Sequence, residues 1–208
     1  MLHVVNHPLI TMKLNKMRDE TTNTKDFRTL LDEIASLMTY EVYKDLKIVP
    51  TGKKITTPTG SIIDKLALEY DLIVVPILRA GIGMSNGVIN MLPTAKIGHI
   101  GLYRDEKTLK PVEYFCKLPK VDHPLVLVCD PMLATGGSAS DAIRILKNKG
   151  YKNIRLLCLV GAPEGVKKLQ EDHPDIDIYL CALDEKLNEK GYIIPGLGDA
   201  GDRIFGTY

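Results

Sequence analysis

The sequence predicts an α/β fold with a central, mostly parallel five-stranded sheet flanked by helices. Five largely apolar runs are typical of strands that are buried on both faces of a sheet. They occupy residues 71–78, 96–103, 125–130, 153–162 and 175–183. Helix-like segments separate most of these runs, which is the pattern of a parallel sheet with helical crossovers. In such sheets, ligands bind beyond the carboxyl ends of the strands.

The segment before the sheet is predicted to hold one helix and one hairpin. Apolar residues from Phe27 to Met38 recur at spacings of three and four, which predicts an amphipathic helix with Thr24 as its cap. The stretch 48–63 is rich in Thr, Ile, Pro and Gly and predicts two short strands with a turn. A hairpin this polar, with its prolines, is expected at a sheet edge or as a projecting arm.

Three helical segments are expected among the strands. Residues 79–87, RAGIGMSNG, turn from the first strand into a helix-like stretch. A second helix runs from about Ser138 to Lys149 and is ended by Gly150, and a third lies near residues 164–170. A chain of 208 residues is long for one domain and short for two. We therefore expect a single domain over residues 1–208.

The composition narrows the classes of function. The chain is 45% hydrophobic and 25% charged with a net charge of +1, which is ordinary for a soluble globular protein. This balance of charges does not indicate binding to nucleic acid or to an anionic membrane. We find no signal-peptide pattern and no apolar run of about 18 residues, the length that spans a bilayer.

The cysteines and histidines indicate neither disulfides nor a structural metal. The four cysteines are far apart and form no CxxC pair. Cys129 and Cys158 lie inside apolar runs, so we expect buried, reduced thiols. The histidines lack metal-ligand spacing. Together these features predict a cytoplasmic protein.

The third apolar run ends in an acid and a glycine-rich turn. Asp130 follows five apolar residues, which places its carboxylate at the rim of the sheet rather than in the core. Residues 134–138, ATGGS, then open a helix, and their N–H groups with the hydroxyls of Thr135 and Ser138 can cradle a phosphate. No lysine follows the glycines, so this is not a P-loop. The alternative is a tight strand-to-helix turn with a serine cap.

Two arginines follow other strands. Arg79 stands before two glycines and can bind phosphate oxygens beside exposed backbone N–H groups. Arg104 opens the charged segment 104–110, RDEKTLK, which resembles a mobile lid. The alternatives are a surface arginine at a turn and a solvated loop, and we favour the solvated loop for residues 105–107.

The C-terminal segment is rich in glycine. Residues 196–201, GLGDAG, match GxGxxG, but only seven residues remain after Gly201. A dinucleotide site needs a following helix, another strand and an acid about 20 residues further on, and this context is therefore missing. A tail whose backbone donors and acceptors are free is instead suited to hydrogen-bonding with the edge of a flat polar ring. Apolar residues at 192–194 and Phe205 argue against a floppy terminus.

These blocks resemble the type I phosphoribosyltransferases. The strand, Asp130 and the Thr-Gly-Gly turn resemble the family's motif for 5-phosphoribosyl 1-diphosphate (PRPP). Most members carry a second acid where Pro131 stands, and DPMLATGGS resembles the uracil branch. PILRAGIGM at 76–84 and GYIIPGLGDAGDRIFGT at 191–207 resemble the same branch. The resemblance implies a small base-binding hood formed by about 191–208 and a projecting hairpin arm at about 48–63.

The resemblance also implies a reaction, in which uracil and PRPP give UMP and diphosphate in pyrimidine salvage. Mg²⁺ would be carried on the diphosphate, with no metal held directly by the protein. Arg79 and Arg104 would bind the diphosphate, and Asp130 the ribose hydroxyls. With Asp199, these three are the expected catalytic residues. The full expected PRPP set is Arg79, Arg104, Asp130, Pro131, Met132, Leu133, Ala134, Thr135, Gly136, Gly137, Ser138 and Asp199.

Uracil is expected to lie against Ile193, Gly198, Asp199 and Ala200. Its edge runs acceptor, donor, acceptor, which a folded backbone loop can match, whereas cytosine would leave buried groups unpaired. Such a site can reject the wrong base by about 10⁴-fold. In the family, Asp199 would lie near both substrates, with Mg²⁺ and water as intermediaries.

The family resemblance further suggests a homodimer or higher assembly, and GTP as an effector. Three other functions compete with this interpretation. An RNA-binding regulator of pyrimidine genes on the same fold would need a basic face, which a net charge of +1 does not indicate. A non-catalytic nucleotide-binding module needs no base-reading tail. A transferase acting on purines would differ in that tail.

Overall fold

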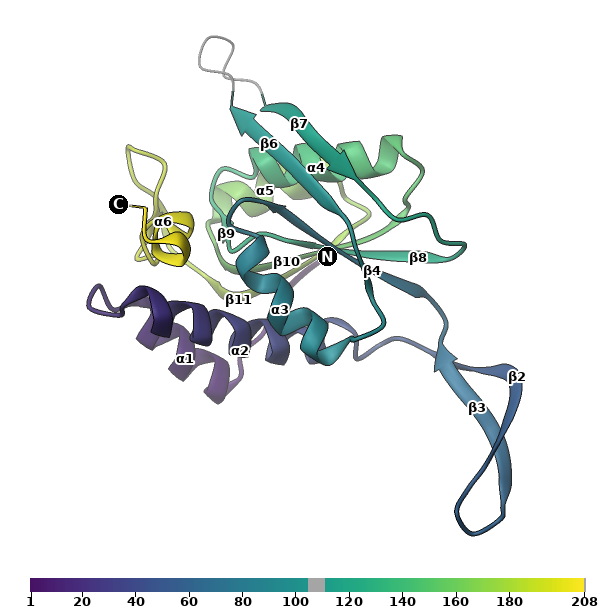
Figure 1. Ribbon diagram of the computed structural model, residues 1–208. Helices are drawn as coiled ribbons and strands as arrows, with labels where there is room; N and C mark the ends of the chain where they lie inside the picture. The colour runs from purple at the N-terminus through teal and green to yellow at the C-terminus, as the bar shows by residue number, and fades with distance from the viewer. Residues whose placement is uncertain (105–110, 208) are drawn as a thin grey trace.

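In the computed structural model, which describes residues 1–104 and 111–207, the five predicted strands are neighbours in one sheet (Figure 1). The four neighbouring pairs are hydrogen-bonded in the order β11-β10-β8-β4-β6. Their bounds are β4 Asp71–Leu78, β6 His99–Arg104, β8 Pro124–Cys129, β10 Asn153–Gly161 and β11 Asp177–Leu183. The pairings among these five strands are parallel, so the predicted fold class is confirmed.

The sheet is wider than the five strands predicted. Strand β1 (Leu2–Val4) adds a parallel edge beside β11, and β7 (Pro111–Lys117) adds an antiparallel edge beside β6. Short strands β5 (Lys96–Ile97) and β9 (Met132–Leu133) pair with β4 and β10. The predicted strand at 96–103 is therefore divided into β5 and β6. Two-residue and three-residue strands carry too little periodicity to be recognised in a sequence.

Helices cover both faces of the sheet (Figure 1). On one face lie α1 (Pro8–Arg18), α2 (Thr24–Val42) and α3 (Ile82–Met91), and on the other α4 (Gly137–Asn148) and α5 (Pro163–Asp172). Successive side chains of a strand point to opposite faces. In β4, Val74 packs with the first layer, while Ile73 and Val75 pack with the second. Burial on both faces explains why the strands are apolar runs.

Two helix boundaries test the predicted caps. The predicted cap at Thr24 is wrong, because Asn23 caps α2 and its side chain accepts a hydrogen bond from the N–H of Asp26 at 2.9 Å. Thr24 is the first helical residue. At the other boundary, Gly150 has φ +93° and directly follows Lys149, the C-cap of α4, so the predicted glycine stop is confirmed.

The predicted hairpin is present and projects from the sheet (Figure 1). Strands β2 (Ile48–Thr56) and β3 (Ile62–Leu68) pair only with each other, and every residue in them is exposed. The hairpin is longer than predicted and ends at Leu68 rather than at residue 63. We call residues 48–68 the arm.

The C-terminal segment is folded. Strands β12 (Lys186–Leu187) and β13 (Ile193–Ile194) form an antiparallel pair, and α6 (Ala200–Phe205) follows. Cys129 and Cys158 are buried, as predicted. Within the described residues, no helix has the length and apolar character needed to cross a membrane. The assignment of residues 1–208 to one domain stays a prediction.

Candidate active site

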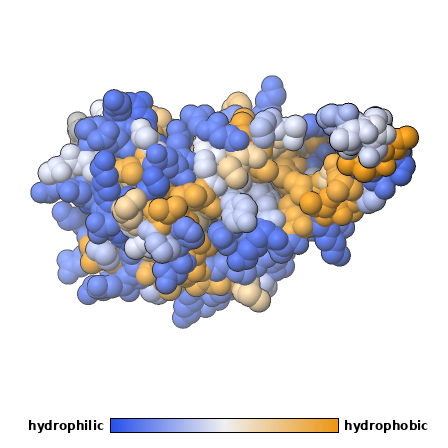
Figure 2. Space-filling model, turned by 90° about the horizontal axis from the view of Figure 1, so that it is seen from below, coloured by the Kyte–Doolittle hydropathy of each residue, from blue (hydrophilic) through white to orange (hydrophobic). Residues whose placement is uncertain are grey.

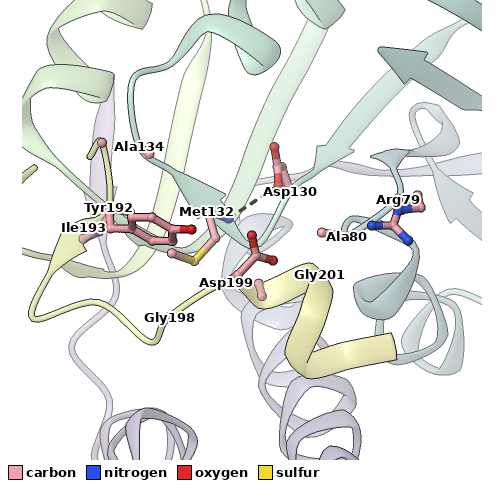
Figure 3. Close-up of a pocket in the computed structure, with 12 residues that line it drawn as sticks. Arg79, Ala80, Asp130, Met132, Ala134, Tyr192, Ile193, Gly198, Asp199 and Gly201 are labelled. Carbon is pink, nitrogen blue, oxygen red and sulfur yellow. Dashed lines mark hydrogen bonds between the residues drawn. The ribbon is translucent and has the colours of Figure 1, made fainter. Parts of the chain in front are cut away.

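A cavity of about 370 Å³ lies where the strand order of the sheet reverses. The chain runs from β4 outward to β6 and then returns to the other side of β4, where β8 lies. Such a reversal opens a crevice at the carboxyl ends of the two strands, where ligands bind in open α/β sheets. Arg79 follows β4 and Asp130 follows β8, so both lie at this crevice (Figure 3). The residues around the cavity are Arg79, Ala80, Asp130, Met132, Ala134, Gly191, Tyr192, Ile193, Gly198, Asp199, Ala200 and Gly201.

Asp130 lies at the rim of the sheet, as predicted, but among protein atoms. Its N–H continues the ladder to the carbonyl of Leu157 at 3.1 Å. Its carboxylate accepts one long bond, 3.5 Å, from the N–H of Met132 (Figure 3). Burial raises the pKa of Asp130 to about 7. A carboxylate with so few protein donors can accept hydrogen bonds from the hydroxyl groups of a ligand.

The glycine-rich turn forms an open helix N-terminus. Gly136 has a left-handed conformation with φ +78° and is the N-cap of α4, without a side-chain cap bond. The alternative of a serine cap at this turn is therefore wrong. The first helical bond comes from the N–H of Ser140 to the carbonyl of Gly136 at 2.9 Å. The N–H groups of 137–139 precede it and have no acceptor within the helix, which suits an anion.

The residues between Asp130 and this turn have two roles. Met132 and Ala134 line the cavity. Pro131 and Leu133 are buried, and the carbonyl of Pro131 accepts the N–H groups of Leu159 and Val160 at 3.1 and 3.2 Å. These two residues therefore fix the backbone against β10 and do not face the cavity.

Arg79 is exposed and lines the cavity. Its guanidinium lies 5.7 Å from the centre of the Phe205 ring, a cation–π distance. In the part of the chain that the structure describes, no carboxylate forms an ion pair with it. Its charge is therefore available to an anionic ligand.

Arg104 ends β6, and its backbone pairs with Pro111 of β7. The rest of the predicted lid, residues 105–110, lies outside the described residues. The predicted contact between Arg104 and the diphosphate stays a prediction.

The other side of the cavity is built by β13, the loop 195–199 and the start of α6. We call residues 195–199 the base loop. Gly196 and Gly198 have φ values of +61° and +79°, which L side chains rarely adopt. The side chain of Asp199 caps α6 by accepting the N–H of Asp202 at 2.9 Å. The four residues predicted around uracil, Ile193, Gly198, Asp199 and Ala200, all line the cavity.

Four cavity residues were not predicted as site residues: Ala80, Gly191, Tyr192 and Gly201. The Tyr192 ring reaches into the cavity beside Met132 (Figure 3). In the sequence Tyr192 counted only as an apolar residue that orders the tail. Its position directly before Ile193, a residue predicted to contact uracil, was the signal that could have marked it.

The donor set around the cavity suits a cation carried by a ligand. Asp130 and Asp199 are its two carboxylates. Among the described residues there is no group of three or more His, Cys, Asp or Glu side chains that could hold a metal ion. Mg²⁺ commonly binds through one or two carboxylates together with substrate phosphates, and the residues present fit that arrangement.

Comparison with solved structures identifies the fold. A structure from Aquifex aeolicus is 38% identical, with a TM-score of 0.91, and the match covers 100% of this chain and 99% of that chain. A hypoxanthine phosphoribosyltransferase from Staphylococcus aureus is 13% identical with a TM-score of 0.50, over 85% of this chain and 81% of that one. The fold is thus that of a phosphoribosyltransferase.

Sequence comparison identifies the family within this class. The family model for uracil phosphoribosyltransferase matches residues 4–207. A uracil phosphoribosyltransferase from Clostridium beijerinckii is 59% identical over 204 residues, which are 98% of this chain and 97% of that protein. The chain belongs to the uracil phosphoribosyltransferase family.

Proposed function

We infer that the protein is an enzyme that transfers the phosphoribosyl group of PRPP to uracil, forming UMP and diphosphate in pyrimidine salvage. One observation carries this conclusion. Asp130, the base loop and Ala134, the first residue of the glycine-rich turn 134–138 that we call the phosphate loop, line a single cavity in a chain that matches the family over almost its full length. The bond between the anomeric carbon and the diphosphate oxygen breaks. A bond to a uracil nitrogen forms, and that nitrogen loses its proton.

The proposed roles follow from charge. The N–H groups of residues 137–139 and the hydroxyls of Thr135 and Ser138 hold the 5′-phosphate. The anomeric carbon gains positive charge as the diphosphate departs, and the Asp130 carboxylate beside it stabilises that charge when ionised. Arg79 and Arg104 bind the departing diphosphate. Removal of one preorganised donor of this kind costs about 3 kcal/mol, or about a hundredfold in rate.

Base selection falls to the base loop. Gly198, the left-handed glycine of this loop that lines the cavity, leaves the neighbouring N–H and C=O groups without a side chain in front of them. These groups can match the acceptor, donor and acceptor along the edge of uracil, with Ile193 and Tyr192 beside the ring. Cytosine would leave at least one buried group unpaired, which is a costly mismatch.

We propose that Mg²⁺ enters with the diphosphate. Asp130 and Asp199 are the carboxylates that would hold it, directly or through water. When bound, the ion would neutralise negative charge on the departing diphosphate. Asp199 already accepts the N–H of Asp202, which orients its carboxylate.

We also propose that the protein acts in the cytoplasm as a homodimer. The arm carries exposed apolar side chains on both strands, including Ile48, Ile62 and Leu66. A second copy of the chain is the partner we propose for this surface, because a two-fold arrangement would cover both arms at once. GTP activation stays a prediction from the family resemblance.

The competing functions have less support. The relatives are named for uracil phosphoribosyl transfer, and the net charge of +1 gives no basis for RNA binding. The hypoxanthine enzyme shares the fold alone at 13% identity. We therefore do not favour an RNA-binding regulator or a purine transferase.

A substrate panel tests the proposed function. The protein is incubated with PRPP, Mg²⁺ and either uracil, cytosine or hypoxanthine, and nucleotides are separated by chromatography. We expect UMP from uracil and no nucleotide from the other two bases. Parallel reactions without Mg²⁺ and with added GTP report on these two ligands. A folded protein that forms no UMP would overturn the proposed function.

A further inference from the structure

A buried ion pair lies behind the base loop, on the side away from the cavity. Arg18, the last residue of α1, meets Asp184, which directly follows β11. The two Nη atoms of Arg18 lie 2.8 and 2.7 Å from the two carboxylate oxygens of Asp184. The Asp184 side chain is 5% exposed and that of Arg18 is 20% exposed. This is a bidentate pair that is shielded from water, the geometry that holds both partners most rigidly.

The pair fixes both backbone groups of Gly196 in the base loop. The N–H of Gly196 donates to Oδ2 of Asp184 at 3.0 Å. The carbonyl of Gly196 accepts from Nη1 of Arg18 at 2.6 Å. A Cβ at this position would lie 2.2 Å from the carbonyl oxygen of Ile193. The loop is thus held against β13, and neither peptide group of Gly196 can rotate without breaking a bond to a charged side chain.

A second arginine ties the same loop to the same end of α1. Nη1 of Arg203 donates to the carbonyl of Leu197 at 2.9 Å and to that of Met17 at 2.5 Å. Its Nη2 donates to the carbonyl of Asp19 at 2.7 Å. The guanidinium also lies 4.5 Å from the centre of the Phe27 ring. Residues 17–19 therefore form the support on which the base loop rests.

The base loop needs this support because it separates two cavities. Gly198 and Asp199 line the substrate cavity and also a second cavity of about 440 Å³. Arg18 and Arg203 line the second cavity and not the first. Gly196 and Leu197 are buried, but Gly198 and Asp199 are exposed and have open space on both sides. These two residues have little packing of their own to set their conformation. The arginines and Asp184 supply that constraint.

We propose that Arg18 and Asp184 are positioning residues that set the specificity for the base. The proposal rests on the proposed function. Base reading by backbone groups requires that each N–H and C=O keeps its direction. A base loop without the Arg18–Asp184 pair can turn its peptide groups, so it binds uracil less tightly and can satisfy cytosine. Apart from Asp199, the residues proposed for PRPP lie on the other elements around the cavity. The Asp199 carboxylate is oriented by its own bond from the N–H of Asp202, so PRPP binding depends little on the pair.

The test uses Arg18→Met, Asp184→Asn and Arg18→Lys in the full-length chain. A bond to a charged partner is worth about tenfold to a hundredfold in binding. We expect Arg18→Met and Asp184→Asn to raise KM for uracil at least tenfold, while KM for PRPP changes less than twofold. The ratio of kcat/KM for uracil to that for cytosine should fall. Arg18→Lys keeps the charge but lacks the planar guanidinium. Its KM for uracil and its uracil-to-cytosine ratio should therefore lie between those of Arg18→Met and the wild type.

Lys13→Met is the matched control. Lys13 lies on the same helix and pairs with Glu33 at 2.6 Å, away from the base loop. This variant removes an ion pair of α1 but should leave both KM values and the base ratio unchanged. If it shifts them like Arg18→Met, the effect is a general loosening of α1 and the proposal is wrong.

The remaining outcomes separate this proposal from the proposed function. A wild-type protein that forms no UMP overturns the function. An active wild type with unchanged uracil KM and base ratio in both pair variants overturns the positioning role, as does a parallel rise in both KM values. Circular dichroism reports folding. If Arg18→Met does not fold, Arg18→Lys decides by the same uracil and cytosine criteria.

Discussion

Asp130 is a site carboxylate whose burial opposes its negative charge. Burial raises its pKa to about 7, and the long bond from the N–H of Met132 offsets this only in part. In the unfolded chain the same group ionises in its ordinary range, near 3.9. Between these two values the folded state keeps a proton that the unfolded state has lost. The free energy of unfolding therefore falls as the pH rises from about 4 to about 7.

We predict that Asp130→Asn is more stable than the wild type at pH 8 but less active. The amide removes the penalty of a buried charge. At about 1.4 kcal/mol per pKa unit, the shift to about 7 corresponds to about 4 kcal/mol, and the partial exposure of Asp130 reduces this by about half. We expect a gain of about 2 kcal/mol in the free energy of unfolding at pH 8, closing near pH 4, and at least a tenfold loss of turnover. Denaturant unfolding and UMP formation measure the two effects. Near wild-type turnover would remove Asp130 from the mechanism, and a gap that does not vary with pH would contradict its ionisation.

At the residue scale, the sequence predicts what is local. An apolar strand followed by Asp130 and then by Gly136 and Gly137 predicts the phosphate loop without any tertiary information. Arg18 and Asp184 carry no such mark, because they are separated by 166 positions and no local pattern links them. Long-range pairs of this kind depend on how α1 packs beneath the sheet, which periodicity does not specify.

At the scale of the elements, α5 supports the phosphate loop by packing directly against its backbone. A Cβ on Gly165 would lie 2.4 Å from the carbonyl oxygen of Ala134, and one on Gly136 would lie 2.8 Å from that of Gly165. At its other end, α5 is joined to α4 through Asp172, which accepts the Ser140 hydroxyl at 2.6 Å. The loop therefore lies against a helix that approaches it without an intervening side chain.

We predict that Gly165→Ala weakens PRPP binding. The added methyl group must displace the Ala134 carbonyl, and overpacking of this kind costs about 1–3 kcal/mol. We expect KM for PRPP to rise about tenfold, with KM for uracil nearly unchanged, in steady-state assays. Lys167→Ala, on the exposed face of the same helix, is the control and should leave both constants unchanged. An unaltered KM for PRPP in folded Gly165→Ala would show that the contact does not shape the loop.

At the element scale, prediction succeeds for long, doubly buried strands and fails for short or edge elements. Strands β4, β8 and β10 are apolar because helices cover both of their faces. Strand β7 lies at an edge and mixes polar with apolar residues, so its sequence, PVEYFCK, shows no clear period. Helix α1 buries only Ile10, Leu14 and Met17, a stripe too narrow to stand out. Helix α6 has six residues, too few for a periodic signal.

On the scale of the whole molecule, the arm is the feature that the rest of the chain leaves uncovered. Hydrophobic side chains gather on it (Figure 2). Ile62 and Leu66 lie two pleats apart on one face of β3 and are 71% and 58% exposed. A two-stranded hairpin alone is marginally stable in water, and contiguous exposed apolar surface marks an interaction site. A second copy of the chain would supply the burial that the arm lacks.

We therefore predict that the double variant Ile62→Lys, Leu66→Lys is monomeric. Two buried charges without partners would oppose association far more than they disturb an arm that already faces water. Sedimentation velocity or light scattering should give twice the chain mass for the wild type and one chain mass for the variant. Lys65→Gln is the control, because this residue points to the opposite face of β3 and should leave the dimer intact. A wild type that is monomeric at micromolar concentration, or a double variant that still dimerises, would show that the arm does not form the interface.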